Sequence, residues 1–117
     1  MRSLRRARGS RLVVAEILLA ASAEMAEAAA WYDERVSGLG ERFLREAEDV
    51  FARIDKRPLT GAPWSHRRLP DGVRRMFLRS FPYSAVYILE PRLVVVALAH
   101  VRRRPGYWAK RLAEISR

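Results

Sequence analysis

Cysteine is absent from the 117-residue chain, and histidine occurs only twice, at His66 and His100. Without cysteine the chain can form neither a disulfide framework nor a zinc site with thiolate ligands, and this composition fits a reducing cytoplasm. Two histidines without convergent carboxylates do not predict a metal site. No glycine-rich phosphate loop, nucleophile elbow or catalytic carboxylate pair is recognisable, so no cofactor is expected.

Long apolar runs are also missing. None approaches the ~20 residues that a membrane-spanning helix requires, so no membrane span is predicted. Five arginines before residue 12, followed by an apolar stretch over 12–23, superficially resemble a secretory signal. However, Glu16 interrupts the apolar part, and cleavage near Ala23 would remove a predicted strand. We therefore interpret residues 1–10 as a flexible basic tail, or as residues upstream of the true start, and residues 11–117 as one domain.

Acidic residues are scarce relative to basic ones, 13 against 23, which gives a net charge of +10. Such an excess favours an acidic partner, whether nucleic acid, an acidic protein or anionic lipid. Binding to phosphates would be strongly salt-dependent. Half of the residues are apolar, which is enough for a core and argues against a disordered chain.

The first half of the domain has the hydrophobic pattern of a strand followed by two helices. Leu12–Ile17 is a short apolar run that predicts the strand. Residues 18–35 are rich in alanine and carry an apolar stripe at steps of three and four, which predicts a helix. Residues 39–56 carry a second stripe. Because only a short glycine-containing loop separates them, the two helices should form an antiparallel hairpin.

The second half has the pattern of a meander. Val73–Phe81 mixes arginines with apolar residues, whereas Ala85–Leu89 and Leu93–Ala99 are continuous apolar runs, and turn residues separate all three. Residues 105–115 predict a short terminal helix. The predicted fold is therefore α+β: a small antiparallel sheet, made of the first strand and the meander, that the helical hairpin covers on one face. The predicted core comprises Val13, Met25, Tyr32, Phe43, Val50, Ile54, Leu78, Val86, Ile88, Val94, Val96 and Leu98.

Cationic side chains gather on the first strand of the meander. Arg75 and Arg79 are an even number of residues apart and should share one face, with Arg74 on the other. This arrangement favours an anion-binding sheet face, for RNA phosphates or acidic side chains, although an ordinary solvated face would have the same pattern.

A second cationic cluster follows the last strand. His100 ends the predicted strand, and the ordinary pKa of a histidine suits a general acid or base. A lone histidine is, however, more often a hydrogen-bonded structural residue. Residues 102–104 are arginines, and Tyr107 and Trp108 follow them. Such a mixture can bind nucleic acid through charge and stacking, or it can hold a terminal helix through cation–π contact.

Two blocks of residues carry a family resemblance. The first is AAAWYDE at 28–34 with GLGERF at 38–43, and the second runs from Phe81-Pro82-Tyr83 through Val86-Tyr87 and Ala99-His100 to Arg104-Pro105, Trp108 and Arg111. In content and order these blocks resemble the RelE/ParE toxin superfamily, specifically its ParE-like, plasmid-stabilisation branch. The resemblance covers most of the chain after Leu12.

The resemblance implies the toxin of a type II toxin–antitoxin system that arrests growth in the cytoplasm. Its antitoxin would be a small, often acidic protein that wraps and neutralises it, and electrostatic attraction would speed their association. ParE-like members are similar to inhibitors of DNA gyrase and carry no enzymatic activity. RelE-like members cut mRNA on the ribosome with basic residues, and where they have an arginine after the tyrosine that opens the middle strand, this chain has Ser84.

The sequence thus favours a non-enzymatic, ParE-like toxin that inhibits gyrase and forms a hetero-oligomer with its antitoxin. One alternative is a RelE-like, ribosome-dependent mRNA endonuclease with Arg79, His100 and Arg102 as catalytic candidates. Another is a basic nucleic-acid-binding module unrelated to toxicity. The predicted contact residues for antitoxin or target are Arg75, Arg79, His100, Arg102, Arg103 and Trp108.

Overall fold

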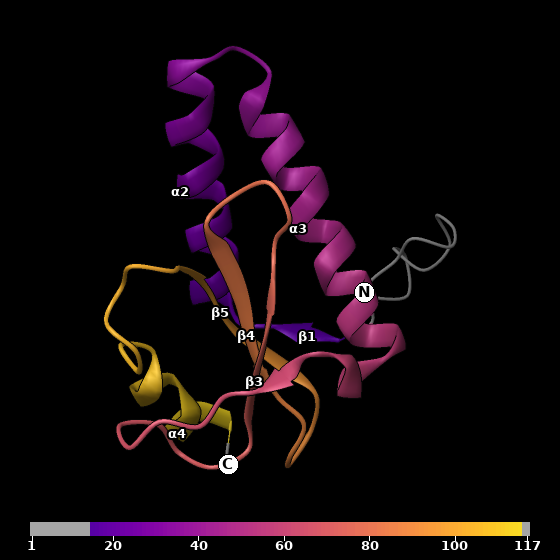
Figure 1. Ribbon diagram of the computed structural model, residues 1–117, viewed down its shortest axis with the longest axis vertical. Helices are drawn as coiled ribbons and strands as arrows, with labels where there is room; N and C mark the ends of the chain where they lie inside the picture. Colours follow the sequence, from indigo (N-terminus) through magenta and orange to yellow (C-terminus); the bar gives the residue numbers. More distant parts are fainter. Residues whose placement is uncertain (1–14, 116–117) are drawn as a thin grey trace.

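The computed structural model describes residues 15–115, and Figure 1 shows how the elements are arranged. Helices α2 (Leu19–Arg35) and α3 (Leu39–Lys56) form the antiparallel hairpin that the sequence predicted. The predicted tail over residues 1–10, half of the first predicted strand (residues 12–14) and the core candidate Val13 lie outside the described residues.

The turn of the hairpin explains the first resemblance block. Gly38 adopts a left-handed conformation, with φ of 89°, which glycine accepts without strain. The Asp33 carboxylate accepts hydrogen bonds from the backbone N–H groups of Gly38 and Gly40, both at 3.0 Å. It thereby satisfies donors at the start of α3 that have no partner within the helix. A side chain at Gly40 would overlap the carbonyl of Ala29, so the two helices approach closely at this point.

Within residues 15–115, the sheet has five strands in the order β1-β5-β4-β3-β2. They are β1 (Glu16–Ile17), β2 (Ala62–Pro63), β3 (Val73–Phe77), β4 (Tyr83–Ile88) and β5 (Val94–His100). The α+β class and the three-stranded meander are confirmed. The expectation of a purely antiparallel sheet is wrong, because β1 pairs with β5 in parallel. The long connection through both helices brings the chain back into the sheet and makes this direction available.

Strand β3 is shorter than predicted, since it ends at Phe77 and not at Phe81. Leu78 already belongs to the connection, where its backbone N–H donates to the carbonyl of Tyr83 at 2.9 Å. Arg79 therefore lies in the turn after β3. The alternation of side chains between the two faces of the strand, which predicted that Arg79 shares a face with Arg75, ends at Phe77. Arg74 does lie on the other face of β3 from Arg75, as predicted. Its guanidinium donates to the carbonyl of Gly61 at 2.7 Å.

The linker between α3 and the meander contains a short 3-10 turn, η1 (Pro58–Thr60), and packs against Tyr87 of the second resemblance block. The Tyr87 hydroxyl donates to the carbonyl of Pro58 at 2.6 Å and accepts from the backbone N–H of Gly61 at 2.9 Å. A side chain at Gly61 would overlap the Tyr87 ring. Glycine at this position allows the linker to lie against β4.

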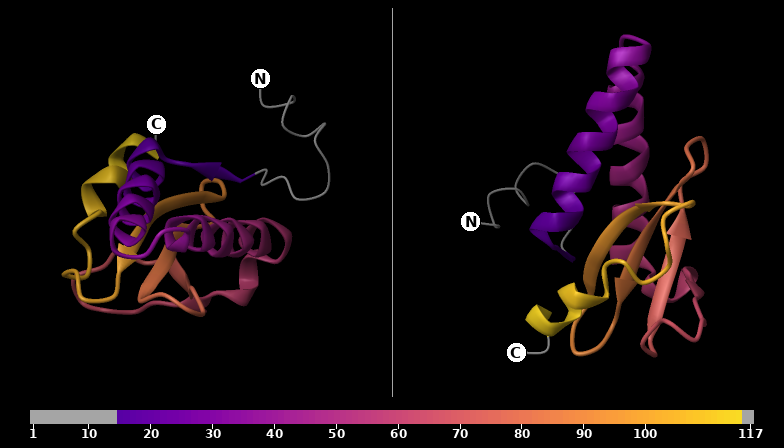
Figure 2. Two further views of the ribbon diagram at one scale, coloured as in Figure 1. Left: turned by 90° about the horizontal axis from the view of Figure 1, so that it is seen from above. Right: turned by 90° about the vertical axis from the view of Figure 1, so that its left-hand side faces the viewer.

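The C-terminal segment is less helical than predicted. It consists of a 3-10 turn, η2 (Ala109–Arg111), and one helical turn, α4 (Leu112–Ile115). Gly106 has a φ of 84°, which breaks the helix that was expected to begin at Pro105. The segment runs below the N-terminal end of α2 (Figure 2).

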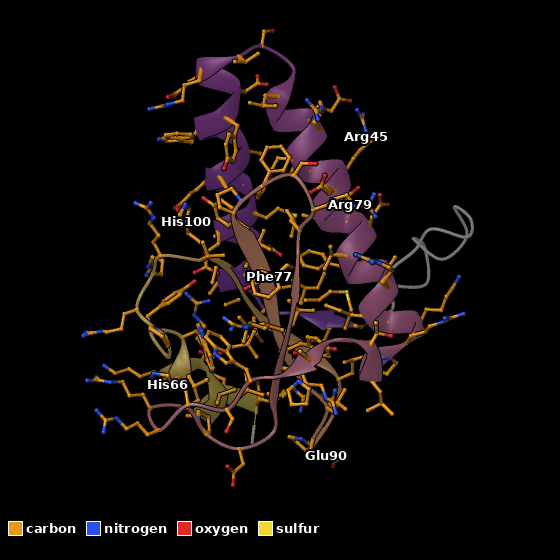
Figure 3. All side chains as sticks on the ribbon, viewed as in Figure 1. Arg45, His66, Phe77, Arg79, Glu90 and His100 are labelled. Carbon is orange, nitrogen blue, oxygen red and sulfur yellow. The ribbon has the colours of Figure 1, made fainter. Side chains whose placement is uncertain are left out.

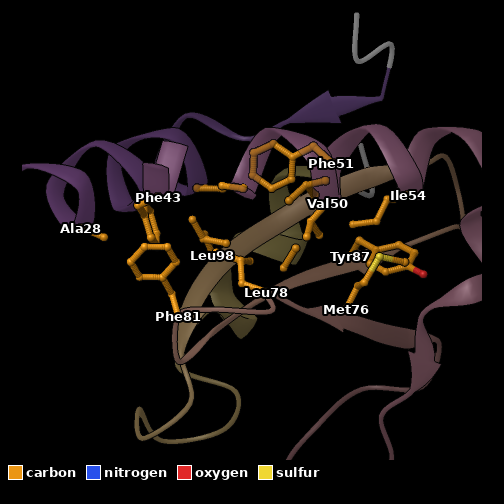
Figure 4. Close-up of a cluster of buried hydrophobic side chains, with 14 of the residues drawn as sticks. Ala28, Phe43, Val50, Phe51, Ile54, Met76, Leu78, Phe81, Tyr87 and Leu98 are labelled. Atoms are coloured by element: carbon orange, nitrogen blue, oxygen red, sulfur yellow. The ribbon is translucent and has the colours of Figure 1, made fainter. Parts of the chain in front are cut away.

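The sheet is buried on both faces. The helices pack on one face, where Phe43, Val50 and Ile54 meet Leu78, Tyr87 and Leu98 (Figure 4). A second cluster on the other face contains Val73, Val86, Ile88, Val94, Val96, Trp108 and Ile115. Burial on both sides explains why β5 is a continuous apolar run without alternation. All described core candidates are buried except Met25 and Tyr32, which are half-buried.

Candidate functional site

A cavity of about 330 Å³ opens on the sheet face that lies away from the helices. Along β3 and β4, residues that line the cavity alternate with residues that face the helical hairpin. Arg75 and Ser84 line the cavity, whereas their neighbours Met76 and Ala85 belong to the helix-side core. Its lining residues are Trp64, Arg75, Ser84, Ala99, His100, Val101, Arg102, Arg103, Arg104, Pro105, Tyr107 and Trp108.

Small residues in the middle of the sheet leave room for the cavity. Ser84 on β4 pairs with Phe77 on β3 and with Ala99 on β5, so these three side chains form one row across the sheet. Ser84 and Ala99 are both buried, and neither side chain extends far from the backbone. Ser84 and Ala99 therefore form the floor of the cavity, and larger side chains surround them.

One wall is an arginine held between aromatic rings. The guanidinium carbon of Arg75 lies 3.8 Å from the centroid of the Trp64 ring and 5.0 Å from that of Phe77. Partial burial disfavours the charged form and lowers the pKa of Arg75 from its ordinary value. Cation–π contact offsets part of that cost.

The opposite wall is the loop that follows β5. The backbone N–H of Arg102 donates to Nδ1 of His100 at 3.0 Å, and that of Arg103 donates to the His100 carbonyl at 3.0 Å. The Arg103 guanidinium carbon lies 3.7 Å from the centroid of the Tyr107 ring. The backbone of the loop thus fixes the orientation of the His100 ring.

Glu24 on α2 fixes the base of this wall, and sequence analysis missed it. Its carboxylate accepts a bidentate pair from the Arg111 guanidinium, at 3.0 and 2.9 Å, and a hydrogen bond from the Tyr107 hydroxyl at 2.7 Å. It also accepts from the backbone N–H of Leu98 at 3.0 Å, while Arg111 donates to the carbonyl of Val96. Glu24 and Arg111 thus provide hydrogen-bond partners for backbone groups of β5 that β1 is too short to pair with.

This network raises the pKa of both donors. Burial, together with the hydrogen bond to Glu24, raises the pKa of Tyr107 far above its ordinary value. The hydrogen bond to the same carboxylate raises the pKa of Arg111. Arg111, at the end of the second resemblance block, was the available signal for this contact.

The charge of the cavity is uncompensated. Its lining includes four arginines, at 75 and 102–104, and no aspartate or glutamate. Within residues 15–115, the salt bridges are made by Arg35, Arg45, Arg92 and Arg111, and by none of these four. The guanidinium groups of the cavity therefore have no carboxylate partner among residues 15–115.

The structure brings together most of the predicted contact residues. Arg75, His100, Arg102 and Arg103 all line the cavity. Arg79 does not, because it lies on the α3 side of the β3–β4 turn, away from His100 (Figure 3). The neighbouring Ser80 is tied to α3 through its backbone N–H, which donates to Glu46 at 2.7 Å.

Trp108 lies in the cavity wall in a different role from the one expected. Its side chain is 1% exposed and packs against Trp64, with 6.1 Å between the ring centroids. A ring this deeply buried supports the wall and does not offer a free face to a partner. Its indole N–H is buried without a hydrogen-bond acceptor among the described residues.

The described chain has few groups for acid–base or metal chemistry at this site. His100 is the only imidazole that lines the cavity, and no carboxylate faces it. No cluster of three or more potential metal-ligating side chains occurs between residues 15 and 115. In that same range, no helix combines the length and the apolar character that crossing a membrane requires.

Comparison with known proteins gives matches to solved structures but no sequence match. No model of a protein family matches the chain, and no curated protein matches it. A chain of the solved chromosomal ParDE TA system from P. aeruginosa is similar in structure, with a TM-score of 0.61 and 17% sequence identity. The match covers 78% of this chain and 98% of that chain. At this identity it establishes that the two chains share a fold.

Proposed function

We propose that this chain is the toxin of a type II toxin–antitoxin system, of the ParE-like kind. The observation that carries the proposal is the shared fold, which extends over nearly the whole of a chain from a ParDE TA system. The two resemblance blocks support it. Asp33 and the glycines of the first block form the helical turn, and His100 and Trp108 of the second block line the cavity.

The proposed action is non-enzymatic inhibition of DNA gyrase in the cytoplasm. The cavity supplies positive charge but only one imidazole and no carboxylate. A RelE-like nuclease would carry an arginine after the tyrosine that opens the middle strand. This chain has Ser84 at that position, on the floor of the cavity. Of the three catalytic candidates for a nuclease, His100 and Arg102 line this cavity while Arg79 lies apart from it. These features favour binding over RNA cleavage.

The experiment that tests this proposal is inducible expression in bacteria with two parallel readouts. Plasmid supercoiling and the SOS response report on gyrase, and mRNA integrity reports on cleavage. We expect growth arrest with altered supercoiling and SOS induction while mRNA stays intact. If a short reading frame that adjoins the gene encodes the antitoxin, its co-expression should restore growth.

Two results would contradict the proposal. Growth arrest with rapid, ribosome-dependent mRNA cleavage, abolished by His100→Ala or Arg102→Ala, would establish the nuclease alternative. Absence of any growth defect from a stably expressed protein would exclude a toxin of either kind and favour a nucleic-acid-binding module.

A further inference from the structure

Two of the four cavity arginines, Arg75 and Arg103, stack on aromatic rings. The guanidinium of Arg75 lies over the Trp64 ring and that of Arg103 over the Tyr107 ring. Stacking covers the face of a guanidinium but leaves the N–H groups at its edge available. Those edge donors match both oxygens of a carboxylate.

The same fold contains a satisfied arginine for comparison. Arg111 donates two hydrogen bonds to Glu24 and a third to the carbonyl of Val96. Arg75 and Arg103 have aromatic neighbours but no carboxylate within the described residues. Arg75 is half-buried, and charged groups at such a position are normally paired. The missing acid at this cavity therefore points to a partner that supplies one.

We infer that the cavity holds an aspartate or glutamate side chain from an acidic segment of the partner protein. This inference rests on the proposed function, since the partner that it describes is the antitoxin. The carboxylate would lie between Arg75 and the arginines of the loop after β5.

Two observations favour a peptide over a nucleic acid. Proteins that bind single-stranded nucleic acid offer free aromatic faces on which bases stack. Here the guanidinium groups already cover the Trp64 and Tyr107 rings, and Trp108 is buried. In addition, the cavity is at the small end of the ~300–1,000 Å³ range of ligand pockets, which suits one or two side chains.

The rim of the cavity suggests what lies next to the acid. Phe77, which pairs with Ser84, and Val101 are each 49% exposed, which is unusual for large apolar side chains on this otherwise buried face. Apolar residues beside the acidic one would cover them. The expected segment is therefore acidic with interspersed apolar residues.

Intrinsic fluorescence tests the inference directly. The chain has three tryptophans, of which Trp64 and Trp108 line the cavity and Trp31 is exposed on α2. In a Trp31→Phe protein, all tryptophan emission comes from the cavity. We expect hexaglutamate to change this emission saturably, and hexaglutamine at the same ionic strength to leave it unchanged.

Charge-neutral variants locate the binding. Arg75→Gln and Arg103→Gln should each weaken hexaglutamate binding about tenfold. Arg102→Gln provides an exposed variant that removes charge without removing an aromatic contact. Arg42→Gln is the matched control, because Arg42 is exposed on α3 and does not line the cavity. It should bind as tightly as the parent protein.

Several outcomes would overturn the inference. These are no response to hexaglutamate, equal weakening in Arg42→Gln, or tighter, cavity-dependent binding of the RNA hexauridylate. The last outcome would assign the cavity to nucleic acid. Because the titration does not require toxicity, failure of peptide binding with growth arrest intact refutes only this inference. Peptide binding without growth arrest refutes only the proposed toxin function.

Discussion

Glu24 is the residue on which the position of the C-terminal segment depends. Its carboxylate contacts Tyr107, Arg111 and the backbone of β5, elements that are more than 70 residues away in sequence. Both members of the Glu24–Arg111 pair are largely shielded from solvent, with side-chain exposures of 15% and 22%. Breaking a shielded, charge-assisted pair is costly because the remaining charge keeps its desolvation penalty.

We therefore expect Glu24→Gln to destabilise the fold by about 2 kcal/mol, since hydrogen bonds to charged groups contribute ~1.5–3 kcal/mol. Urea unfolding followed by circular dichroism would measure this change. Glu27→Gln is the matched control, because Glu27 lies on the same helix with an exposed side chain. Equal stability of the two variants would show that the Glu24 network does not hold the segment in place.

The tyrosines make the fold sensitive to alkaline pH. The chain has four, at positions 32, 83, 87 and 107, and burial is the largest cause of a raised pKa at each of them. Above the ordinary value of about 10, the unfolded chain loses tyrosine protons that the folded chain keeps. The free energy of unfolding should therefore be unaffected below that pH and should fall as pH rises beyond it.

Urea unfolding at successive pH values from about 9 to about 11 would measure this loss. The ultraviolet absorbance of tyrosinate, recorded on the folded protein, gives an independent check. We expect little tyrosinate at pH values where free tyrosine is half ionised. A normal tyrosine titration in the folded state, with constant stability, would contradict the burial described here.

At the scale of elements, the α2–α3 hairpin depends on its turn. Asp33 holds the start of α3 through two backbone N–H groups, and Gly40 allows α2 to approach. Loss of a helix-capping side chain costs ~1 kcal/mol. Asp33→Ala should lower the free energy of unfolding by about that amount, whereas the exposed Glu48→Ala on α3 should leave it nearly unchanged. Chemical denaturation of the two variants would distinguish them, and similar values would contradict the capping role of Asp33.

The hairpin was also the element best predicted from sequence. Its apolar stripes at helical spacing and its glycine turn are local signals, and they gave the helix ends within one residue. The end of β3 was misplaced because Leu78 continues the apolar pattern into the turn, and this error put Arg79 on the wrong face. The direction of β1 was also misjudged, because local alternation does not identify a strand's neighbour.

At the scale of the whole molecule, sequence predicted the cationic residues but not the cavity that they surround. Arg75 and Arg103 belong to separate segments, and only the pairing of β3, β4 and β5 brings them to one face. The hollow itself depends on two small residues, Ser84 and Ala99, which carry no recognisable motif. The Glu24 contacts are equally non-local, since they join α2 to the end of the chain.

The fold as a whole combines two separately buried sheet faces with one basic, unpaired site. The helices stabilise one face, and the C-terminal segment closes most of the other. The remaining opening is lined by arginines without carboxylates. This opening on the second face is where we propose that the acidic partner binds.

The most direct test of the proposed toxin function is a supercoiling assay with purified DNA gyrase, relaxed plasmid and the purified chain. We expect the chain to inhibit supercoiling in a concentration-dependent manner, and co-purified antitoxin to relieve the inhibition. Undiminished supercoiling at saturating concentrations of a folded chain, together with cleavage of mRNA on added ribosomes, would contradict the account and favour the nuclease.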